Sequence, residues 1–300
     1  MGAIFGRKIL FSVLVGLVCL AGGCDSGKDA RESVVLKRVV YKKAGGRELL
    51  LHVFEPAKRD SNSAFSAFLI FHGGGWFMGE PNGMYPHSRY FASRGMVAIS
   101  VQYRLNEDGN RPPIEAIEDA KSAVRYVRSH AASFGIDPNK IAVGGASAGG
   151  HLAVSTALFD KFDSAGEDLQ VSSRPNALVL ISAAFDTTEN GIGSRVLTKF
   201  SRQMAWVRGP EANEFSPLRH IRKIDASCFV IHGTADDIVP FESAERFCKV
   251  MQEAGNSCEL SAMEGQGHQF SVYSEGGDNQ QYEHAMGAIE EFFRSLGFLK

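Results

Sequence analysis

The sequence lacks the features that mark several large classes of protein. It has no run rich in lysine and arginine, and its 32 basic and 34 acidic residues leave a formal net charge of −2 at pH 7. That balance gives no support to nucleic-acid binding. Only five of the 300 residues are cysteine, and none has the spacing of a metal site. The chain also shows no internal repeat and no low-complexity tract.

Apolar residues and glycine are abundant instead. Hydrophobic residues make up 44% of the chain and charged residues 22%, which favours a large buried core over disorder. The 32 glycines cluster at turns after predicted strands, which suits functional loops built on a sheet. A chain of this length makes one large α/β domain or two smaller ones. Because no linker marks a second domain, we expect a single domain over residues 34–300.

The first residues have the order of a secretory signal peptide. A basic pair, Arg7–Lys8, precedes an apolar stretch of thirteen residues over 9–21 and a group of small residues before Cys24. The apolar stretch is too short to span a bilayer comfortably. We expect a signal peptide over residues 1–23, a polar tether over 24–33, and export to the periplasm, the cell envelope or the medium.

The end of this segment also resembles a bacterial lipoprotein signal, in which Cys24 receives the lipid. The match is imperfect, because Ala21 holds the place where a large aliphatic residue is usual and Leu20 lies one position further out. A lipid anchor through Cys24 therefore stays open. Both interpretations predict that the protein is exported.

Three cysteines remain in the mature chain. Cys248 falls on a predicted helix and Cys258 opens the next predicted strand, so these two are the best candidates for a disulfide in an exported protein. Cys228 begins a buried strand and is expected to pack as a small apolar residue. Spacing along the chain does not give a distance, so the bridge itself stays open.

Apolar runs and helical periodicities alternate along the chain. Two β-type runs surround a glycine turn near the start, and further strands and helices follow in alternation. This order predicts an α/β fold with a mainly parallel sheet, helices on both faces and an N-terminal antiparallel hairpin. The predicted strands cover residues 34–41, 49–54, 67–71, 96–103, 140–143, 177–183, 228–231 and 257–263. The predicted helices cover residues 114–132, 152–159, 241–254 and 281–296.

The connection over residues 187–225 is about twice as long as an ordinary connection needs to be. We interpret it as a small, partly helical insertion over the strand tips that shapes a substrate pocket. The predicted pocket walls are residues 82–87, 187–219 and 269–279.

One serine is framed by glycines between a predicted strand and a helix-favouring segment. Gly145 and Gly149 lie two residues to either side of Ser147, which is the nucleophile-elbow pattern. Such a turn projects the hydroxyl from the sheet edge and closes only if its neighbours are tiny. It also brings the serine to a helix N-terminus, where free N–H groups favour negative charge. A strand-to-helix loop rich in small residues is the alternative interpretation.

A nucleophilic serine needs a base that is held by a third group. We predict His268, on a short loop after the last predicted strand, as the base. We predict Asp236, in the turn after another buried strand, as the orienting acid, with Asp237 and then Asp186 as alternatives. Adjacent residues in a turn point in different directions, so only one of the neighbouring aspartates can serve. The resulting chain order, Ser147 before acid before histidine, is the order expected of triads with this elbow.

The glycine run over residues 72–76 follows a predicted core strand. Without a Cβ atom, its amides can approach a substrate closely. We predict that the backbone N–H groups of Gly74, Gly75 and Ala148 form an oxyanion hole. One such donor typically contributes roughly 3–4 kcal/mol in the transition state.

Four motifs together resemble the α/β-hydrolase superfamily, and most of all its esterase/lipase group similar to hormone-sensitive lipase. They are His72–Trp76, Tyr103–Leu105, Gly145–His151 and His232–Asp236. The elbow Ser147–Leu152 and the segment Phe215–Leu218 also resemble bacterial carbohydrate acetyl- and feruloyl-esterases. The resemblance runs from about residue 34 to the end of the chain. Trp76 and His151, which belong to these motifs, are predicted to bind substrate.

The resemblance implies a serine carboxylesterase that hydrolyses short-chain carboxylic esters through an acyl-enzyme, without a metal or cofactor. Acetyl groups on carbohydrate are a candidate substrate, and a small-molecule or carbohydrate ester is the expected partner. An amidase, peptidase or lipase on the same fold is an alternative, as is a non-catalytic surface binding protein. The sequence leaves the acyl and alcohol specificity and the oligomeric state open.

Overall fold

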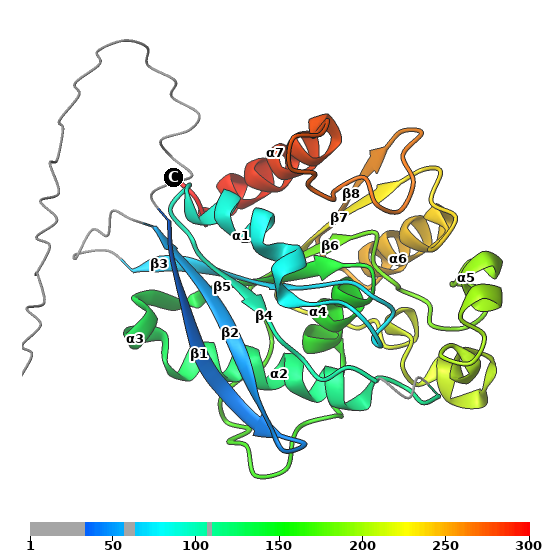
Figure 1. Cartoon of the computed structure of the whole chain (residues 1–300), viewed down its shortest axis with the longest axis horizontal. Helices are drawn as coiled ribbons and strands as arrows, with labels where there is room; N and C mark the ends of the chain where they lie inside the picture. The colour runs from blue at the N-terminus through cyan, green and yellow to red at the C-terminus, as the bar shows by residue number, and fades with distance from the viewer. Residues whose placement is uncertain (1–33, 57–63, 107–109) are drawn as a thin grey trace, which may run out of the picture.

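The computed structural model describes residues 34–56, 64–106 and 110–300, which form an eight-stranded sheet flanked by helices (Figure 1). The spatial order of the strands is β1-β2-β4-β3-β5-β6-β7-β8. Their bounds are β1 Val34–Ala44, β2 Arg47–Pro56, β3 Phe65–Phe71, β4 Val97–Val101, β5 Ile136–Ala146, β6 Ala177–Ile181, β7 Ser227–Gly233 and β8 Cys258–Met263. The predicted signal peptide and tether lie outside the described residues.

Strand β2 runs antiparallel to both of its neighbours, β1 and β4, and all other neighbouring strands are parallel. The prediction of a mainly parallel sheet with an N-terminal antiparallel hairpin is therefore confirmed. In the hairpin turn, Gly45 and Gly46 both have positive φ, +59° and +72°. Two-residue hairpin turns that match the strand twist need this conformation, which glycine adopts without a steric penalty.

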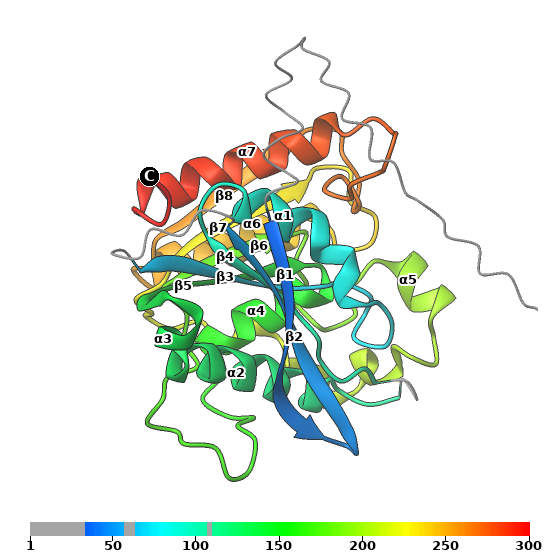
Figure 2. The ribbon, with the colours of Figure 1, turned by 60° about the vertical axis from the view of Figure 1, so that its left-hand side comes forward.

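Helices cover both faces of the sheet (Figure 2). Helices α2, α4 and α6 share one apolar core with Leu69 of β3, whereas α1 and α7 share a second core with Phe68 on the opposite face. Successive side chains of a strand point to opposite faces, so the buried run of β3 serves both cores. The α-helices are α1 Tyr85–Ala92, α2 Ile114–Ser129, α3 Ala131–Phe134, α4 Ala148–Leu158, α5 Ser194–Lys199, α6 Phe241–Glu253 and α7 Gln280–Ser295.

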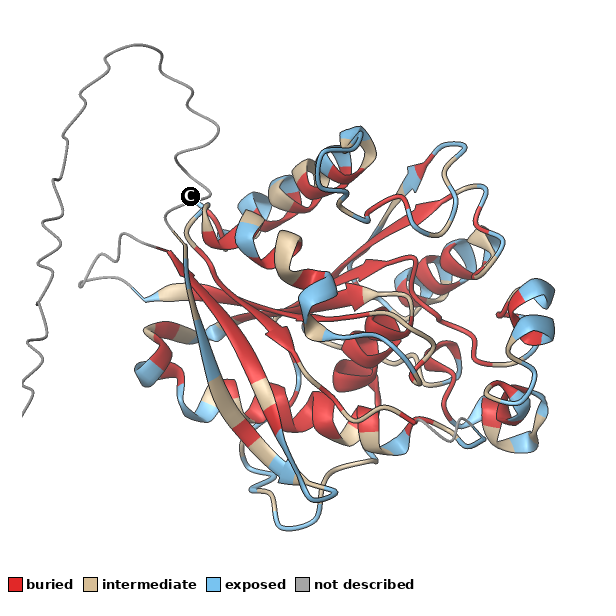
Figure 3. Ribbon diagram, in the orientation of Figure 1, coloured by how far each residue is buried: buried red, intermediate tan, exposed pale blue. Residues whose placement is uncertain are grey.

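Burial follows the sheet order. The central strands are buried almost throughout, whereas β1, at the edge, has exposed and half-buried residues along most of its length (Figure 3). This explains why the central strands are continuous apolar runs in the sequence. Within the described ranges, none of the helices has the length and apolar character needed to cross a bilayer.

Several boundaries differ from the predicted ones. Strand β5 begins at Ile136, four residues before the predicted start, and reaches the elbow. The helix predicted over 114–132 stops at Ser129, and the short α3 follows until Gly135, whose left-handed φ of +65° ends it. The insertion over 187–225 is partly helical as predicted, with α5 and three 3₁₀-helices: η2 Ala205–Arg208, η3 Pro210–Asn213 and η4 Pro217–Arg219. Helix α1 and the preceding 3₁₀-helix, η1 Pro81–Met84, were not predicted.

The three cysteines of the described chain lie together and are buried. The Sγ atoms of Cys248 on α6 and Cys258 on β8 lie 2.7 Å apart, and both are thiols in this structure. Cys228 is the β-sheet partner of Cys258 across the β7–β8 pair. The two residues that the sequence favoured for a bridge are thus adjacent in space.

Candidate active site

Ser147 occupies a sharp turn between β5 and α4. Its backbone has φ +55° and ψ −119°, a conformation that residues other than glycine rarely adopt. Its N–H donates to the carbonyl of Ile181 at 2.8 Å. A Cβ atom on Gly145 or Gly149 would lie 2.5 or 2.1 Å from the Phe71 carbonyl oxygen. The flanking glycines are therefore required by close packing against β3, as the elbow pattern predicts.

His268 is held by Asp236. Its Nδ1 lies 2.7 Å from Asp236 Oδ2, and Asp236 Oδ1 accepts the backbone N–H groups of Ile238 and Val239, both at 2.9 Å. Because a carboxylate only accepts, Nδ1 of His268 carries the hydrogen, which leaves Nε2 free to act as a base. The carboxylate thus sets both the tautomer and the orientation of the imidazole.

A second histidine supports the same carboxylate. Nε2 of His232 lies 2.9 Å from the Val239 carbonyl oxygen and 3.1 Å from Asp236 Oδ2, so it donates to both. Burial alone would raise the pKa of Asp236, but the hydrogen bonds from His232 and His268 outweigh burial and hold that pKa well below its usual range. Asp236 is consequently ionised at every pH at which the fold is expected to persist.

The two alternative acids lie elsewhere. Asp237 is largely exposed and pairs with Arg195 at 2.9 Å. Asp186 accepts hydrogen bonds from the backbone and hydroxyl groups of Thr188, at 3.0 and 2.7 Å. Of the three aspartates considered from the sequence, the structure brings Asp236 to His268.

Ser147 and His268 line one cavity of about 470 Å³. All three predicted oxyanion donors, Gly74, Gly75 and Ala148, line it as well. Residues from each of the three predicted pocket walls contribute to it, among them Met84, Val196, Phe200, Met204 and Val272. The nucleophile, the base and the amide donors of the predicted site thus face the same space.

The glycine loop after β3 has an unusual backbone. Gly74, Gly75 and Trp76 have φ values of +119°, +58° and +67°. The Gly74 carbonyl accepts the N–H groups of Phe77 and Met78, at 3.2 and 3.0 Å, which closes a tight turn. A Cβ atom on Gly74 would lie 2.0 Å from the Met78 carbonyl oxygen, so only glycine fits there. The loop geometry therefore explains why the sequence has glycine at this position.

Trp76 lines the cavity, but His151 does not. His151 is fully buried, and its Nδ1 accepts the indole N–H of Trp76 at 3.1 Å while its Nε2 donates to the Phe215 carbonyl at 2.8 Å. Burial lowers the pKa of His151 to about 4, so the ring is neutral and can accept at Nδ1. The prediction that His151 binds substrate is corrected: both ring nitrogens are used inside the protein, behind Trp76.

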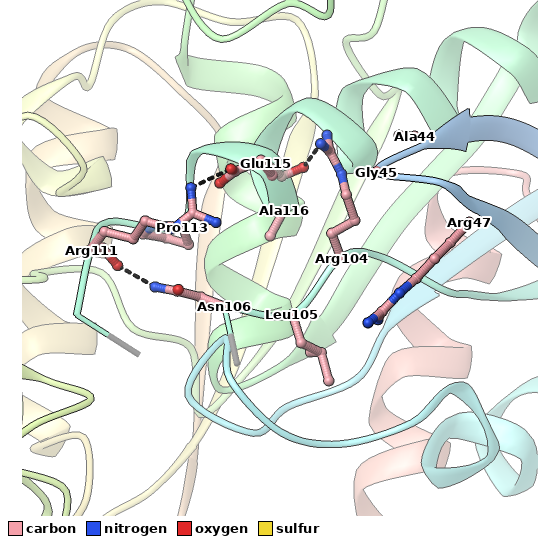
Figure 4. A pocket seen from close by; sticks show the side chains of 10 residues that line it. All are labelled: Ala44, Gly45, Arg47, Arg104, Leu105, Asn106, Arg111, Pro113, Glu115 and Ala116. Carbon is pink, nitrogen blue, oxygen red and sulfur yellow. Dashed lines mark hydrogen bonds and ion pairs between the residues drawn. The ribbon is translucent and has the colours of Figure 1, made fainter. Parts of the chain in front are cut away.

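A second cavity, of about 280 Å³, lies beside the β1–β2 hairpin and shares no lining residue with the first (Figure 4). Charged groups there are paired within the protein. Arg104 binds Asp119 and Glu118, and Arg111 pairs with Glu115. We interpret the charged side chains around this cavity as part of an ion-pair network that holds the segment after β4 against α2.

Among the described residues, no three His, Cys, Asp or Glu side chains gather in a way that could hold a metal ion. The site presents a serine hydroxyl, an oriented imidazole and a set of backbone donors.

Comparison with known proteins agrees with this geometry. The profile of the BD-FAE family matches residues 51–251, and that of the dienelactone hydrolase family matches residues 209–297. The chain is 38% identical to esterase 2 of Thermogutta terrifontis, whose apo structure superposes with a TM-score of 0.78 over 88% of this chain and 96% of that one. The same esterase has been solved phosphorylated by paraoxon and with butyrate bound.

Two mycobacterial proteins are also similar. The probable carboxylic ester hydrolase LipM of Mycobacterium tuberculosis is 30% identical over 60% of this chain and 43% of its own length. Esterase LipC of the same organism is 29% identical over 81% of this chain and 61% of its own length. The chain thus spans about half the length of these curated relatives.

Proposed function

Because the chain belongs to the BD-FAE family of α/β-hydrolase esterases, we propose that it is a serine carboxylesterase that hydrolyses short-chain carboxylic esters. The observation that carries the proposal is the joint placement of three groups. Ser147 sits on a strained elbow, His268 is held by Asp236, and the nucleophile and base open on one cavity beside the amide donors.

The proposed reaction has two halves. In the first, Nε2 of His268 accepts the proton of the Ser147 hydroxyl while the serine oxygen bonds to the ester carbonyl carbon. The negative charge passes to the carbonyl oxygen, which the N–H groups of Gly74, Gly75 and Ala148 receive. The ester C–O bond then breaks, and His268 returns the proton to the departing alcohol.

The second half repeats these steps with water. His268 takes a proton from the water molecule, the resulting oxygen bonds to the acyl carbon, and the serine leaves with its proton restored. Asp236 stays ionised throughout and stabilises the positive imidazolium. The products are a free acid and the regenerated enzyme.

The proposed acyl group is short. The cavity wall from the insertion is mostly apolar, with Ile192, Val196, Phe200 and Met204 beside Lys199. The related Thermogutta esterase has been solved with propionate and with butyrate bound. Acetyl groups on carbohydrate are the natural candidate, since the elbow and the segment after Phe215 resemble carbohydrate esterases.

The test combines a label with a substrate panel. We expect a fluorophosphonate probe to label the wild-type protein and to leave Ser147→Ala unlabelled. The panel compares p-nitrophenyl acetate, acetylated xylan and an aryl amide; we expect the first two to be hydrolysed and the amide to be a poor substrate. Full activity in a clean preparation of Ser147→Ala would refute the assigned nucleophile. Preference for the amide would favour an amidase.

We further propose that the protein is exported. The basic pair, apolar stretch and small residues before Cys24 support a signal peptide. Expression in a bacterial host, followed by fractionation and intact-mass measurement, tests this. We expect loss of residues 1–23, and a lipid mass that disappears in Cys24→Ser would establish the anchor. A full-length chain in the cytoplasm would contradict export.

A further inference from the structure

One polar side chain in the active-site cavity has no partner. His87 of α1 lines the cavity but is only 2% exposed. Neither of its ring nitrogens has a hydrogen-bond partner among the described residues. The backbone of Ser271 lies close enough to influence the ring but outside ordinary hydrogen-bond geometry. Because leaving a buried polar group unpaired costs stability, such groups are rare and call for an explanation.

His87 differs in this respect from the other unpaired groups. Five side chains in the described ranges have a buried polar atom without a partner: His87, Ser88, Asn106, Ser182 and His232. Of these five, His87 alone lines the cavity that holds Ser147. An unpaired group in the lining of a cavity can be satisfied by a ligand that enters the cavity, whereas the other four groups are not part of that lining.

The protonation state of the His87 ring limits the kinds of group that it can bind. Burial lowers the pKa of His87 to about 4, so the imidazole is neutral near pH 7 and offers one N–H donor and one acceptor. Its edge-to-face contact with the Tyr282 ring, at 5.2 Å between centroids, holds its orientation. Met84 and Val272 form apolar parts of the same lining. A hydroxyl group, which donates and accepts at one atom, is complementary to such a ring.

We propose that His87 is a specificity-determining residue that hydrogen-bonds a hydroxyl group of the bound ester. The inference rests on the proposed function, because it takes the cavity at Ser147 to be the place where an ester binds. The hydroxyl belongs either to the alcohol part or to the acyl part of the substrate, and the experiment separates the two.

The experiment uses two pairs of esters of nearly equal size. In the first pair, 2-hydroxyethyl acetate and propyl acetate differ by a hydroxyl on the alcohol part. In the second, ethyl glycolate and ethyl propionate differ by a hydroxyl on the acyl part. The readout is the ratio of kcat/KM within each pair. The intrinsic reactivity of each ester does not depend on the protein variant. A change in the kcat/KM ratio from one variant to another therefore reports a change in the protein.

We expect His87→Phe to lower the ratio of one pair about fivefold, the factor that corresponds to one hydrogen bond between neutral groups. His87→Gln, whose amide also donates and accepts, should keep part of that preference. The matched control is Ser88→Ala, which removes an unpaired buried group from the same helix outside the cavity and should keep the wild-type ratios. The pair that responds identifies the part of the substrate that carries the hydroxyl.

Unchanged ratios in His87→Phe and His87→Gln for both pairs would overturn the proposal; a His87 that binds only water gives this result. If His87→Phe fails to fold, His87→Leu supplies a smaller apolar replacement and the same comparison decides. If wild-type protein hydrolyses none of the four esters, the proposed function fails instead. The two failures are therefore distinguishable.

Discussion

Three buried histidines make the stability of this fold sensitive to mild acid. His72, His87 and His151 are almost fully enclosed, and burial lowers the pKa of each to about 4. In the unfolded chain a histidine titrates near its ordinary value of about 6.5. Between these two values the unfolded chain binds three protons that the folded chain does not. Acid therefore favours unfolding over this range.

The magnitude follows from the two pKa values. Lowering the pH from 7 to 5 removes about 1.8 kcal/mol of unfolding free energy for each of the three histidines, or roughly 5.5 kcal/mol in total. The loss of unfolding free energy begins near the histidine pKa of the unfolded state and levels off below the pKa of the folded state. Since small domains are stable by only about 5–15 kcal/mol, the predicted change is a large part of the total. Asp236 does not offset this loss of stability, because its carboxylate stays ionised in the folded state between pH 7 and pH 5.

The assay is urea denaturation at a series of pH values between 7 and 5. His87→Phe removes one of the three titrating groups without breaking a hydrogen bond, so we expect its pH slope to be about a third smaller than that of wild type. Ser88→Ala, from the same helix, should keep the wild-type slope. A wild-type protein that is equally stable at pH 7 and pH 5, or an unchanged slope in His87→Phe, would refute the reasoning.

Further predictions concern the catalytic groups and the cysteines. Asp236→Asn should lower kcat about ten-thousandfold, while Asp237→Asn, next to it but largely exposed, should behave like wild type; similar losses in both would mean that the acid is misassigned. Gly74→Ala should lower kcat roughly a hundred- to a thousandfold, because the clash displaces an oxyanion donor; steady-state kinetics would detect it, and near-normal kcat would place the donors elsewhere. Cys248 and Cys258 should be found linked in a non-reducing peptide map of protein recovered from an oxidising compartment, and finding both as free thiols there would contradict the bridge.

The sequence could place the proposed catalytic groups at one edge of the sheet because each follows an evident apolar run. Ser147, Asp236 and His268 come after β5, β7 and β8, and these parallel strands deliver their carboxyl ends to one edge of the sheet. The chemistry of each residue type then narrowed the choice. Local geometry in the sequence indicated that only one of the adjacent Asp236 and Asp237 could serve, and the structure brings Asp236 to the histidine.

Residues whose roles depend on distant partners were not predictable in this way. The position of His151 depends on Trp76 and on the Phe215 carbonyl, which lies 64 residues further along the chain. Helix α1 escaped prediction because it is only eight residues long and polar residues interrupt its apolar spacing. The sequence placed His87 at the end of a predicted pocket wall, residues 82–87, but without that helix its burial could not be predicted.

The position of His151 also connects the substrate pocket to the oxyanion loop. Trp76 keeps a positive φ, a conformation that costs about 1–3 kcal/mol and persists only where its surroundings hold it. Its carbonyl accepts the backbone N–H of Asn106 at 2.8 Å, and its side chain is held by the hydrogen bond to His151 and by an edge-to-face contact with Trp206, 5.5 Å between ring centroids. Trp206 and Phe215, the other partner of His151, both belong to the insertion.

The insertion therefore has two roles. It supplies the apolar wall of the pocket through residues such as Val196 and Phe200, and it braces the loop that carries the Gly74 and Gly75 amides. A change in the insertion that moves Trp206 or Phe215 while it widens the pocket for a longer acyl group also loosens the support behind Trp76. Because the oxyanion donors act only when they are held in place, such a change affects kcat as well as KM.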